Sequence, residues 1–343
     1  MLDDLKYIHE RDVQDALGIA EKQWQQLEHK FEISFGSAQQ FDNVVFAGMG
    51  GSALAAQIAL SWPGVSVPFE IVRGYDIPSY VDEKTLFIAS SYSGNTEETL
   101  SALAQAEKTG AVITIIAAGG QLIDIAKDKD YPCLLLPQSG QPRFAALVSL
   151  KALVSVLVAA QMAEPNTRDE LAQSAEWLKE SLQTWLPTVP TAKNPAKTLA
   201  LEIIGKSVVM YGGPKMYPAA YKWKISFNEN AKHIAWVNQY PEFNHNEFMG
   251  WTKQPVDKPY AVIEIRSNLE HPRIQKRFEV TERLLSGMRP SPFVVQPEGD
   301  TLMKQLLWVI AYGDFVSLYV ALLNGINPTP VDLIEKFKKS LDD

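Results

Sequence analysis

The sequence VVFAGMGGS, residues 44–52, joins a short apolar run to a glycine-rich turn. A second stretch, TLFIASSYSGNT at residues 85–96, has the same design, with serine and threonine in its turn. The apolar runs predict buried strands, and the patterns that follow at 53–60 and 96–108 predict helices. Each turn then directs unpaired backbone N–H groups toward one point with a helix dipole behind them, which is a geometry that binds an anion.

The second turn carries hydroxyl groups suited to a terminal phosphate. Ser91, Ser93 and Thr96 place three hydroxyls within six residues at a junction of strand and helix. Three hydroxyls suit the oxygens of a phosphate monoester better than a bridging pyrophosphate. We therefore predict a phosphate-binding set from the two turns, which comprises Gly50, Gly51, Ser52, Ser91, Ser93 and Thr96.

Two other interpretations of these turns are open. Gly48, Gly50 and Ala53 fit the looser dinucleotide pattern G-x-G-x-x-A, and Glu70 falls where a ribose-binding acid is expected. Any single serine or threonine, Thr96 included, also serves as a helix cap.

Composition is typical of an ordinary globular protein. The chain has 343 residues, of which 46% are hydrophobic, and this length predicts two domains or two halves of one architecture. A net charge of −8 and the lack of a Lys/Arg-rich arm argue against a nucleic-acid partner. Cys133 is the single cysteine, which excludes internal disulfides. The acidic N-terminus lacks the pattern of a signal peptide, so cytoplasmic residence is expected.

One segment, 144–162, is nearly long and apolar enough to span a membrane. Lys151 lies near its middle, together with Ser149 and Ser155. We interpret the segment as a buried helix that packs on a sheet or a subunit partner, and we expect no membrane partner.

Short β-like runs alternate with helical stretches, which predicts α/β architecture of the doubly wound, flavodoxin-like type. The runs expected to form strands are 44–47, 85–90, 112–116, 133–136, 207–211, 260–265 and 292–295. A polar stretch rich in proline and asparagine separates two such halves. The predicted division is therefore 1–163 with the phosphate turns, 164–195 as a linker, and 196–343 with a second sheet.

The polar segments 227–233 and 241–247 gather carboxylates, amides and two of the five histidines. Carboxylate and imidazole are the groups most easily tuned to exchange protons near neutral pH, so Glu229 and His245 are candidates for proton transfer. A metal site from His233, His245 and Glu247 is the alternative. No H-E-x-x-H or comparable ligand spacing occurs, and we predict no metal.

These motifs together resemble a known family. The pairing of GMGGS with SYSGNT is similar to the sugar isomerase (SIS) fold, and the segments 227–232 and 244–246 resemble the bifunctional phosphoglucose/phosphomannose isomerases within it. The stretch 142–146 is similar to that family's arginine motif, although Phe144 departs from it, and 327–338 is similar to its terminal lysine helix. The resemblance covers most of the chain.

The resemblance implies two SIS subdomains, each a parallel sheet flanked by helices. It implies a homodimer with active sites near the subunit boundary. The reaction implied is the reversible conversion of glucose 6-phosphate, with mannose 6-phosphate as a second aldose, into fructose 6-phosphate, so the expected ligand is a hexose 6-phosphate. This reaction requires no cofactor.

The resemblance also implies roles for four residues. Glu229 is the base that moves a proton between C2 and C1, and His245, sixteen residues later, acts in opening the sugar ring. Lys338 donates to the ring oxygen, and Arg143 stabilises the charge of the enediolate. General chemistry supports the roles of Glu229 and Arg143, because a carboxylate abstracts a proton from the carbon next to a carbonyl group only if a fixed cation stabilises the enediolate.

Three alternatives accompany these assignments. Lys336 and Lys339 lie beside Lys338, and a basic helix C-terminus also complements the helix dipole. The chain could instead be a non-catalytic SIS sugar-phosphate sensor. It could also act as an isomerase of another sugar phosphate or amino-sugar phosphate, because one fold hosts many substrates.

Overall fold

The computed structural model describes residues 1–35, 40–138, 140–253 and 259–341. Internal contacts divide the chain into two compact units. The first unit comprises Lys22–Glu180 with Thr301–Leu307, and the second comprises Met1–Glu21, Ser181–Asp300 and Trp308–Asp343. By this division the chain passes from one unit to the other after Glu21, Glu180, Asp300 and Leu307. The boundaries at residues 163 and 195 stay a prediction from the sequence.

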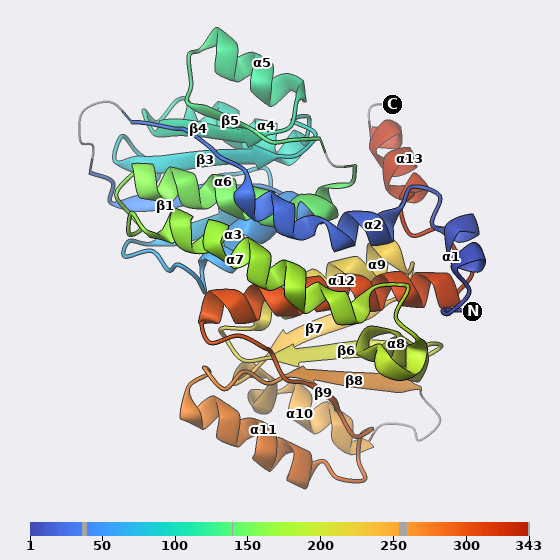
Figure 1. Cartoon of the computed structure of the whole chain (residues 1–343). Helices are drawn as coiled ribbons and strands as arrows, with labels where there is room; N and C mark the ends of the chain where they lie inside the picture. Colours follow the sequence, from blue (N-terminus) through green and yellow to red (C-terminus); the bar gives the residue numbers. More distant parts are fainter. Residues whose placement is uncertain (36–39, 139, 254–258, 342–343) are drawn as a thin grey trace. The chain divides into compact units, whose positions relative to one another are not determined.

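The elements alternate between strands and helices in both units (Figure 1). The strands are β1 (Asn43–Ala47), β2 (Phe69–Val72), β3 (Thr85–Ser91), β4 (Val112–Ala117), β5 (Cys133–Leu135), β6 (Ser207–Gly212), β7 (Ala235–Gln239), β8 (Tyr260–Ile265) and β9 (Phe293–Val295). The α-helices are α1 (Leu5–Arg11), α2 (Ala16–Glu21), α3 (Leu54–Ala59), α4 (Glu97–Ala106), α5 (Gly120–Asp128), α6 (Ala146–Ala159), α7 (Thr167–Leu182), α8 (Pro195–Ile203), α9 (Tyr217–Asn230), α10 (Glu247–Gly250), α11 (Pro272–Leu284), α12 (Leu302–Leu323) and α13 (Asp332–Leu341). The 3₁₀ helices are η1 (Gln23–Glu28), η2 (Gly50–Ala53), η3 (Pro142–Ala145), η4 (Gln183–Trp185), η5 (Thr191–Lys193), η6 (Glu242–His245) and η7 (Trp251–Lys253).

The sheet of the first unit has the order β2-β1-β3-β4-β5, and every pair in it is parallel. This is the flavodoxin-like order, in which ligands bind where the strand order reverses, here between β1 and β3. All seven residues of β3 are buried, as expected for a strand covered on both faces. The doubly wound α/β prediction is confirmed.

The sheet of the second unit has the order β7-β6-β8-β9 and is also entirely parallel. Its strand order reverses between β6 and β8. The edge strands β2 and β7 were not predicted from the sequence. Both are only partly buried and contain polar residues, so neither forms the apolar run that marks a central strand.

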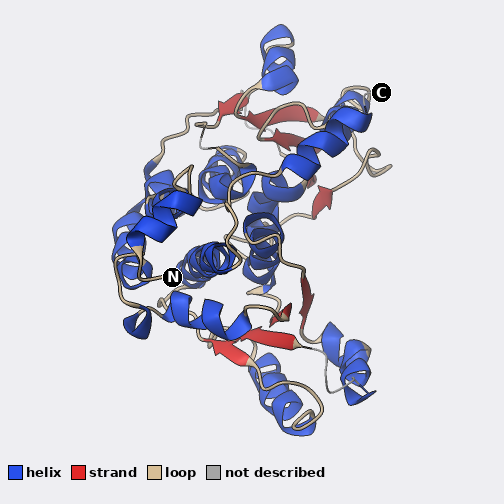
Figure 2. Ribbon diagram, turned by 90° about the vertical axis from the view of Figure 1, so that its right-hand side faces the viewer, coloured by secondary structure: helices blue, strands red, loops and turns tan. Residues whose placement is uncertain are grey.

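Helices cover both faces of each sheet (Figures 1 and 2). In the first unit, Leu103 of α4 and Leu122 of α5 pack against alternate residues of β1, β3 and β4. In the second unit, Ile274 and Phe278 of α11 pack against Tyr211 and Val262, and α9 lies on the opposite face (Figure 1). Burial on these faces therefore positions the turns at the strand ends.

Two helical segments are long and apolar enough to cross a membrane by length and composition, Pro142–Ala159 and Leu302–Leu323. Of the residues in the most apolar 18-residue stretch of each segment, 83% and 94%, respectively, are buried inside the protein. Lys151 of α6 donates to the carbonyl of Arg168 at 2.5 Å, which satisfies its ammonium group within the unit. Packing within the protein accounts for the apolar surface, as predicted for 144–162.

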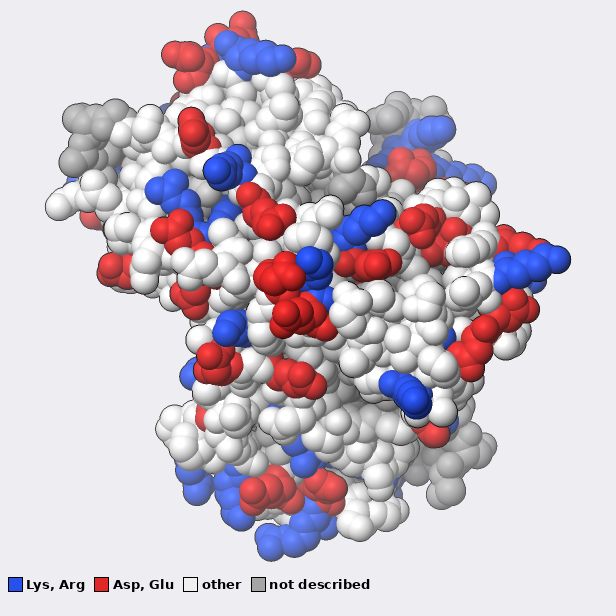
Figure 3. Space-filling model, viewed as in Figure 1, with Lys and Arg blue, Asp and Glu red and all other residues white. Residues whose placement is uncertain are grey.

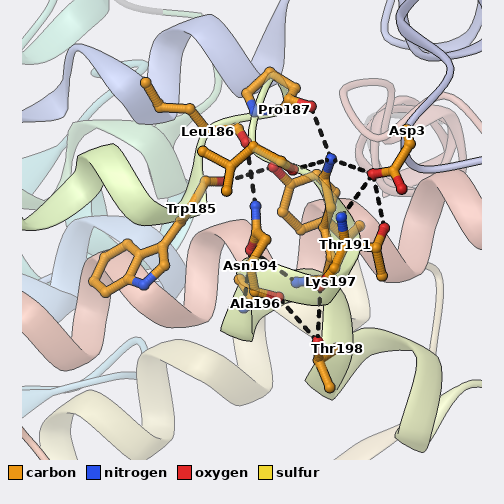
Figure 4. A network of polar contacts seen from close by, with 11 residues as sticks. Asp3, Trp185, Leu186, Pro187, Thr191, Asn194, Ala196, Lys197 and Thr198 are labelled. Carbon is orange, nitrogen blue, oxygen red and sulfur yellow. Dashed lines mark hydrogen bonds and ion pairs between the residues drawn. The ribbon is translucent and has the colours of Figure 1, made fainter.

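Lys197 of α8 ties the N-terminus to the segment before that helix (Figure 4). Its side chain is fully buried, and its ammonium group donates to the Asp3 carboxylate at 3.1 Å and to the carbonyls of Pro187 and Val189 at 2.7 and 2.8 Å. Asn194 caps the same helix through the N–H groups of its first turn. The charge of Lys197 is thus satisfied entirely by protein oxygens in the second unit.

Candidate active site

The hydroxyl groups of the SYSGNT turn converge at the end of β3. The Ser91 hydroxyl lies 2.7 Å from the Thr96 hydroxyl and 3.4 Å from that of Ser93. The N–H of Gly94 donates to the Ser91 oxygen at 3.1 Å. The structure therefore brings the three predicted hydroxyls of this turn to one place.

Thr96 stands at the N-cap position of α4, but its side chain makes no capping hydrogen bond. Its hydroxyl bonds to Ser91 instead. The capping interpretation is therefore wrong for Thr96. Its hydroxyl points to the cluster at the strand end, where it is placed to meet an anion at the N-terminus of α4.

The two turns meet at the switch point of the first sheet. Strands β1 and β3 are neighbours, with Ala47 beside Ala89. The N–H of Tyr92 donates to the Ser52 hydroxyl at 2.9 Å, which joins the GMGGS turn to the SYSGNT turn. Gly50 has a φ of 47°, a conformation that glycine adopts without strain. The hydroxyl groups of Ser52, Ser91, Ser93 and Thr96 thus lie where two neighbouring strands end, and we call this group the cradle.

Arg143 lies beside this cradle because Gly51 has no side chain. A Cβ atom on Gly51 would lie 3.0 Å from the backbone nitrogen of Arg143, closer than real Cβ atoms tolerate comfortably. The Arg143 side chain is buried, and its guanidinium lies 4.7 Å from the centre of the Phe144 ring. Phe144, which departs from the family motif, therefore packs against the arginine that the motif supplies.

The structure weakens the dinucleotide interpretation of the GMGGS turn, because the acid that this interpretation needs already has a hydrogen-bond partner. Glu70 of β2 accepts a hydrogen bond from the Tyr80 hydroxyl at 2.6 Å. The acid expected to bind a ribose is thus engaged by a neighbouring side chain. The hydroxyl cluster around Ser91 favours a phosphate monoester instead.

In the second unit, Glu229 lies in the last turn of α9 and is partly exposed. The Lys232 ammonium donates to the Glu229 carbonyl at 2.8 Å and to the carbonyls of Asn327 and Pro328 at 3.3 and 3.1 Å. Lys232 has a φ of 49°, so the chain turns sharply after the helix. Lys232, for which the sequence predicted no role, therefore ties the end of α9 to the loop that leads into α13.

His245 ends η6, and its side chain is exposed. Its neighbour Asn244 donates to the Thr281 hydroxyl at 3.0 Å and accepts from Arg277 at 3.1 Å, both on α11. On the other side, Glu247 accepts hydrogen bonds from Tyr211 and Asn238. The His245 segment is therefore fixed at both of its flanks.

These contacts account for the polar residues around His245 and weaken the metal alternative. Glu247 is held by Tyr211 and Asn238, while the His233 ring bonds to the carbonyl of Lys206 at 2.5 Å. Within the described ranges, no three His, Cys, Asp or Glu side chains gather to hold a metal ion. His233 and Glu247 therefore each have a hydrogen-bond partner within the second unit.

Lys338 lies on the exposed helix α13 and pairs with Glu335 of the same helix at 3.0 Å. Glu229, His245 and Lys338 belong to the second unit, and Arg143 and the cradle belong to the first. Charged side chains of both signs are interspersed over the face drawn in Figure 3. On the face drawn there, local dipoles and single cations, rather than a broad basic surface, are available to hold an anion.

Known proteins share both the sequence and the fold of this chain. Residues 192–341 match the family model described as the bacterial phospho-glucose isomerase C-terminal SIS domain. A bifunctional phosphoglucose/phosphomannose isomerase of Caldicellulosiruptor bescii is 34% identical over 309 residues, which cover 89% of this chain and 91% of that protein. A D-glucosamine-6-phosphate 4-epimerase of Sulfolobus acidocaldarius is also 34% identical, over 87% of this chain and 89% of that protein.

A solved structure, a glucose-6-phosphate isomerase like protein from Thermus thermophilus, superposes with a TM-score of 0.66. The match covers 98% of both chains at 17% sequence identity. This likeness shows that the two proteins share a fold of two parallel sheets flanked by helices.

Proposed function

This chain belongs to the bifunctional phosphoglucose/phosphomannose isomerase family, and from that premise we propose that it interconverts glucose 6-phosphate and mannose 6-phosphate with fructose 6-phosphate. It is a sugar-phosphate aldose–ketose isomerase and therefore an enzyme. The alternative of a non-catalytic sensor is set aside, because the relatives named above are enzymes.

The cradle at the β1/β3 switch point is the observation that carries the proposal. Hydroxyl groups are supplied there by Ser52, Ser91, Ser93 and Thr96. Pro142 packs against Gly51, and the buried Arg143 is the next residue in the chain. A phosphate dianion held in this cradle provides binding energy remote from the reacting carbons. That energy fixes the position of C1 and C2 relative to the catalytic groups.

In the mechanism that we propose, Glu229 accepts the proton from C2 of the open-chain aldose and returns it to C1. The electron pair of the C–H bond forms the C1–C2 double bond of the enediolate, and the negative charge develops on the C1 oxygen. The proton of the C2 hydroxyl passes to the C1 oxygen, so the C2 carbonyl and the C1 hydroxyl of the ketose form when C1 receives its proton. Arg143 stabilises that charge, and preorganised donors of this kind contribute about 3–4 kcal/mol. His245 and Lys338 act earlier by moving the proton between the ring oxygen and the C1 hydroxyl.

An amino-sugar phosphate is the second candidate substrate. The epimerase from Sulfolobus acidocaldarius is as similar to this chain as the isomerase from Caldicellulosiruptor bescii, at 34% identity each. In this proposal the cradle binds the phosphate group. Its hydroxyls do not distinguish a hydroxyl from an amino group at C2 of the sugar. D-glucosamine 6-phosphate is therefore included in the test.

The test is an assay of the purified protein with fructose 6-phosphate in the presence of a metal chelator. Enzymatic coupling measures glucose 6-phosphate and mannose 6-phosphate separately, and conversion of D-glucosamine 6-phosphate is followed by chromatography. We expect both aldoses to form and expect Glu229→Gln to lose about 10²–10⁴-fold in kcat while sugar-phosphate binding survives. Full activity of that variant would remove Glu229 as the base, and conversion of the amino sugar alone would refute the hexose assignment.

We also propose that the enzyme is a homodimer. The helix α13 has no buried residue, and Leu333, Phe337 and Leu341 are all exposed on it. An amphipathic helix with an uncovered apolar face suits a subunit contact. Cytoplasmic residence remains a prediction from the sequence.

A further inference from the structure

The second unit repeats the switch-point geometry of the first. Strands β6 and β8 lie side by side, and each leads through a turn into a helix, α9 and α11 respectively. The strand β6 ends at Gly212 and the turn after it begins with Gly213, but this turn lacks the hydroxyl cluster found after β3. The second unit therefore has a turn at the same topological position, but a different group occupies it.

The group that occupies the turn after β6 is the carboxylate of Glu270, a residue of the turn after β8. One of its oxygens accepts the backbone N–H groups of Lys215 and Met216 at 2.9 and 3.1 Å, immediately before α9 begins. Glu270 is 3% exposed. A buried carboxylate thus lies against two backbone N–H groups at the positive end of a 14-residue helix.

The surrounding turn is shaped to receive this side chain. A Cβ atom on Gly213 would lie 2.3 Å from the carboxyl carbon of Glu270, so glycine makes the space. The Lys215 ammonium donates to the Leu269 carbonyl at 2.7 Å, and Gln275 donates to the Glu270 carbonyl at 2.8 Å. Burial raises the pKa of the Glu270 carboxyl, and the two backbone amides oppose that shift.

We propose that Glu270 is a built-in anion, which fills in the second unit the position that a substrate phosphate takes in the first and thereby positions α9. The comparison with a bound phosphate rests on the proposed function. The role of Glu270 itself rests on its own contacts. Since α9 carries Glu229 in its last turn, Glu270 is a positioning residue for the proposed base, and it limits each chain to one phosphate site.

The first experiment counts phosphate sites. Titration calorimetry with inorganic phosphate is performed on the wild-type protein, Glu270→Ala and the control Glu279→Ala, which removes an exposed carboxylate of α11. We expect Glu270→Ala to bind one more phosphate per chain than the other two proteins. Equal stoichiometry in all three would overturn the proposal. If the first unit binds no phosphate, the proposed function fails, but the difference between variant and wild type still decides the role of Glu270.

The second experiment measures positioning. We expect Glu270→Ala to lose about tenfold in kcat with little change in KM, because a small misplacement of a catalytic group is costly, and we expect sodium formate to restore kcat. A cap that is merely structural would not respond to a small anion, so absence of rescue refutes the positioning role. If Glu270→Ala does not fold, Glu270→Gln replaces it. That variant keeps the shape without the charge, and its Tm is expected about 2–4 °C lower; an unchanged Tm would refute the need for an anion.

Discussion

Replacement of Asp314 by alanine is expected to destabilise the second unit strongly. Asp314 of α12 accepts hydrogen bonds from the Lys222 ammonium and, at 2.8 Å, from the Ser226 hydroxyl, both on α9. One turn further, Asn230 donates to the Ser317 hydroxyl at 2.9 Å. Lys222, Ser226 and Asn230 are spaced by four residues, so they form one buried polar face of the helix that carries the proposed base.

The expected magnitude follows from burial. Lys222 is 0% exposed and Asp314 is 4% exposed, so water cannot replace the lost partner. Removal of one member of a buried ion pair leaves an uncompensated charge and costs about 3–5 kcal/mol of unfolding free energy. For a unit of this size, that loss corresponds to a fall in Tm of roughly 6–20 °C.

The assay is urea unfolding followed by circular dichroism, with Lys276→Ala as the control. Lys276 and Glu279 form an exposed pair at 2.7 Å, and loss of such a pair changes stability by less than about 1 kcal/mol. The double variant Lys222→Met with Asp314→Leu removes both charges. It is expected to recover at least about 2 kcal/mol relative to Asp314→Ala, because no charge remains unpaired. A loss below about 1 kcal/mol in Asp314→Ala, or no recovery in the double variant, would refute the reasoning.

Two further predictions concern the cradle and the N-terminus. Ser91→Ala is expected to raise KM for fructose 6-phosphate about 10–100-fold, since a hydrogen bond to a charged group contributes about 1.5–3 kcal/mol. Steady-state kinetics checks this beside the control Ser101→Ala, which removes a partly exposed hydroxyl of α4 that bonds to the Tyr75 carbonyl; an unchanged KM in Ser91→Ala would contradict the cradle. A hydrogen bond from Thr191 lowers the pKa of Asp3 below its ordinary value of 3.8, so the stability that Asp3 contributes is complete above that pH and is lost as the pH falls through the lowered pKa. Asp3→Asn should therefore reduce stability at about pH 6 and have little effect at about pH 2, and urea unfolding at both values would exclude this if the two losses were equal.

The central strand pairs β1 and β3, and β6 and β8, were predictable from the sequence, because a strand buried on both faces leaves an apolar run in the chain. The cradle was predictable for a related reason. Ser91, Ser93 and Thr96 lie within six residues of one another, so their proximity is local. The edge strands β2 and β7 were not predictable in this way, since they keep one side in water and their alternation is broken by polar residues.

Local sequence patterns were therefore sufficient to predict the central strands, the turns after them, the α/β class and the closeness of the three hydroxyls in the SYSGNT turn, because neighbouring side chains and backbone preferences decide these features. Three contacts came to light in the folded chain alone: Glu270 bonds to the turn before α9, Asp314 pairs with Lys222, and α11 holds Asn244 beside His245. Each of these contacts joins segments separated by dozens of residues. Their partners are selected by the parallel pairing of strands and the packing of helices on the sheet, and neither leaves a local pattern in the chain.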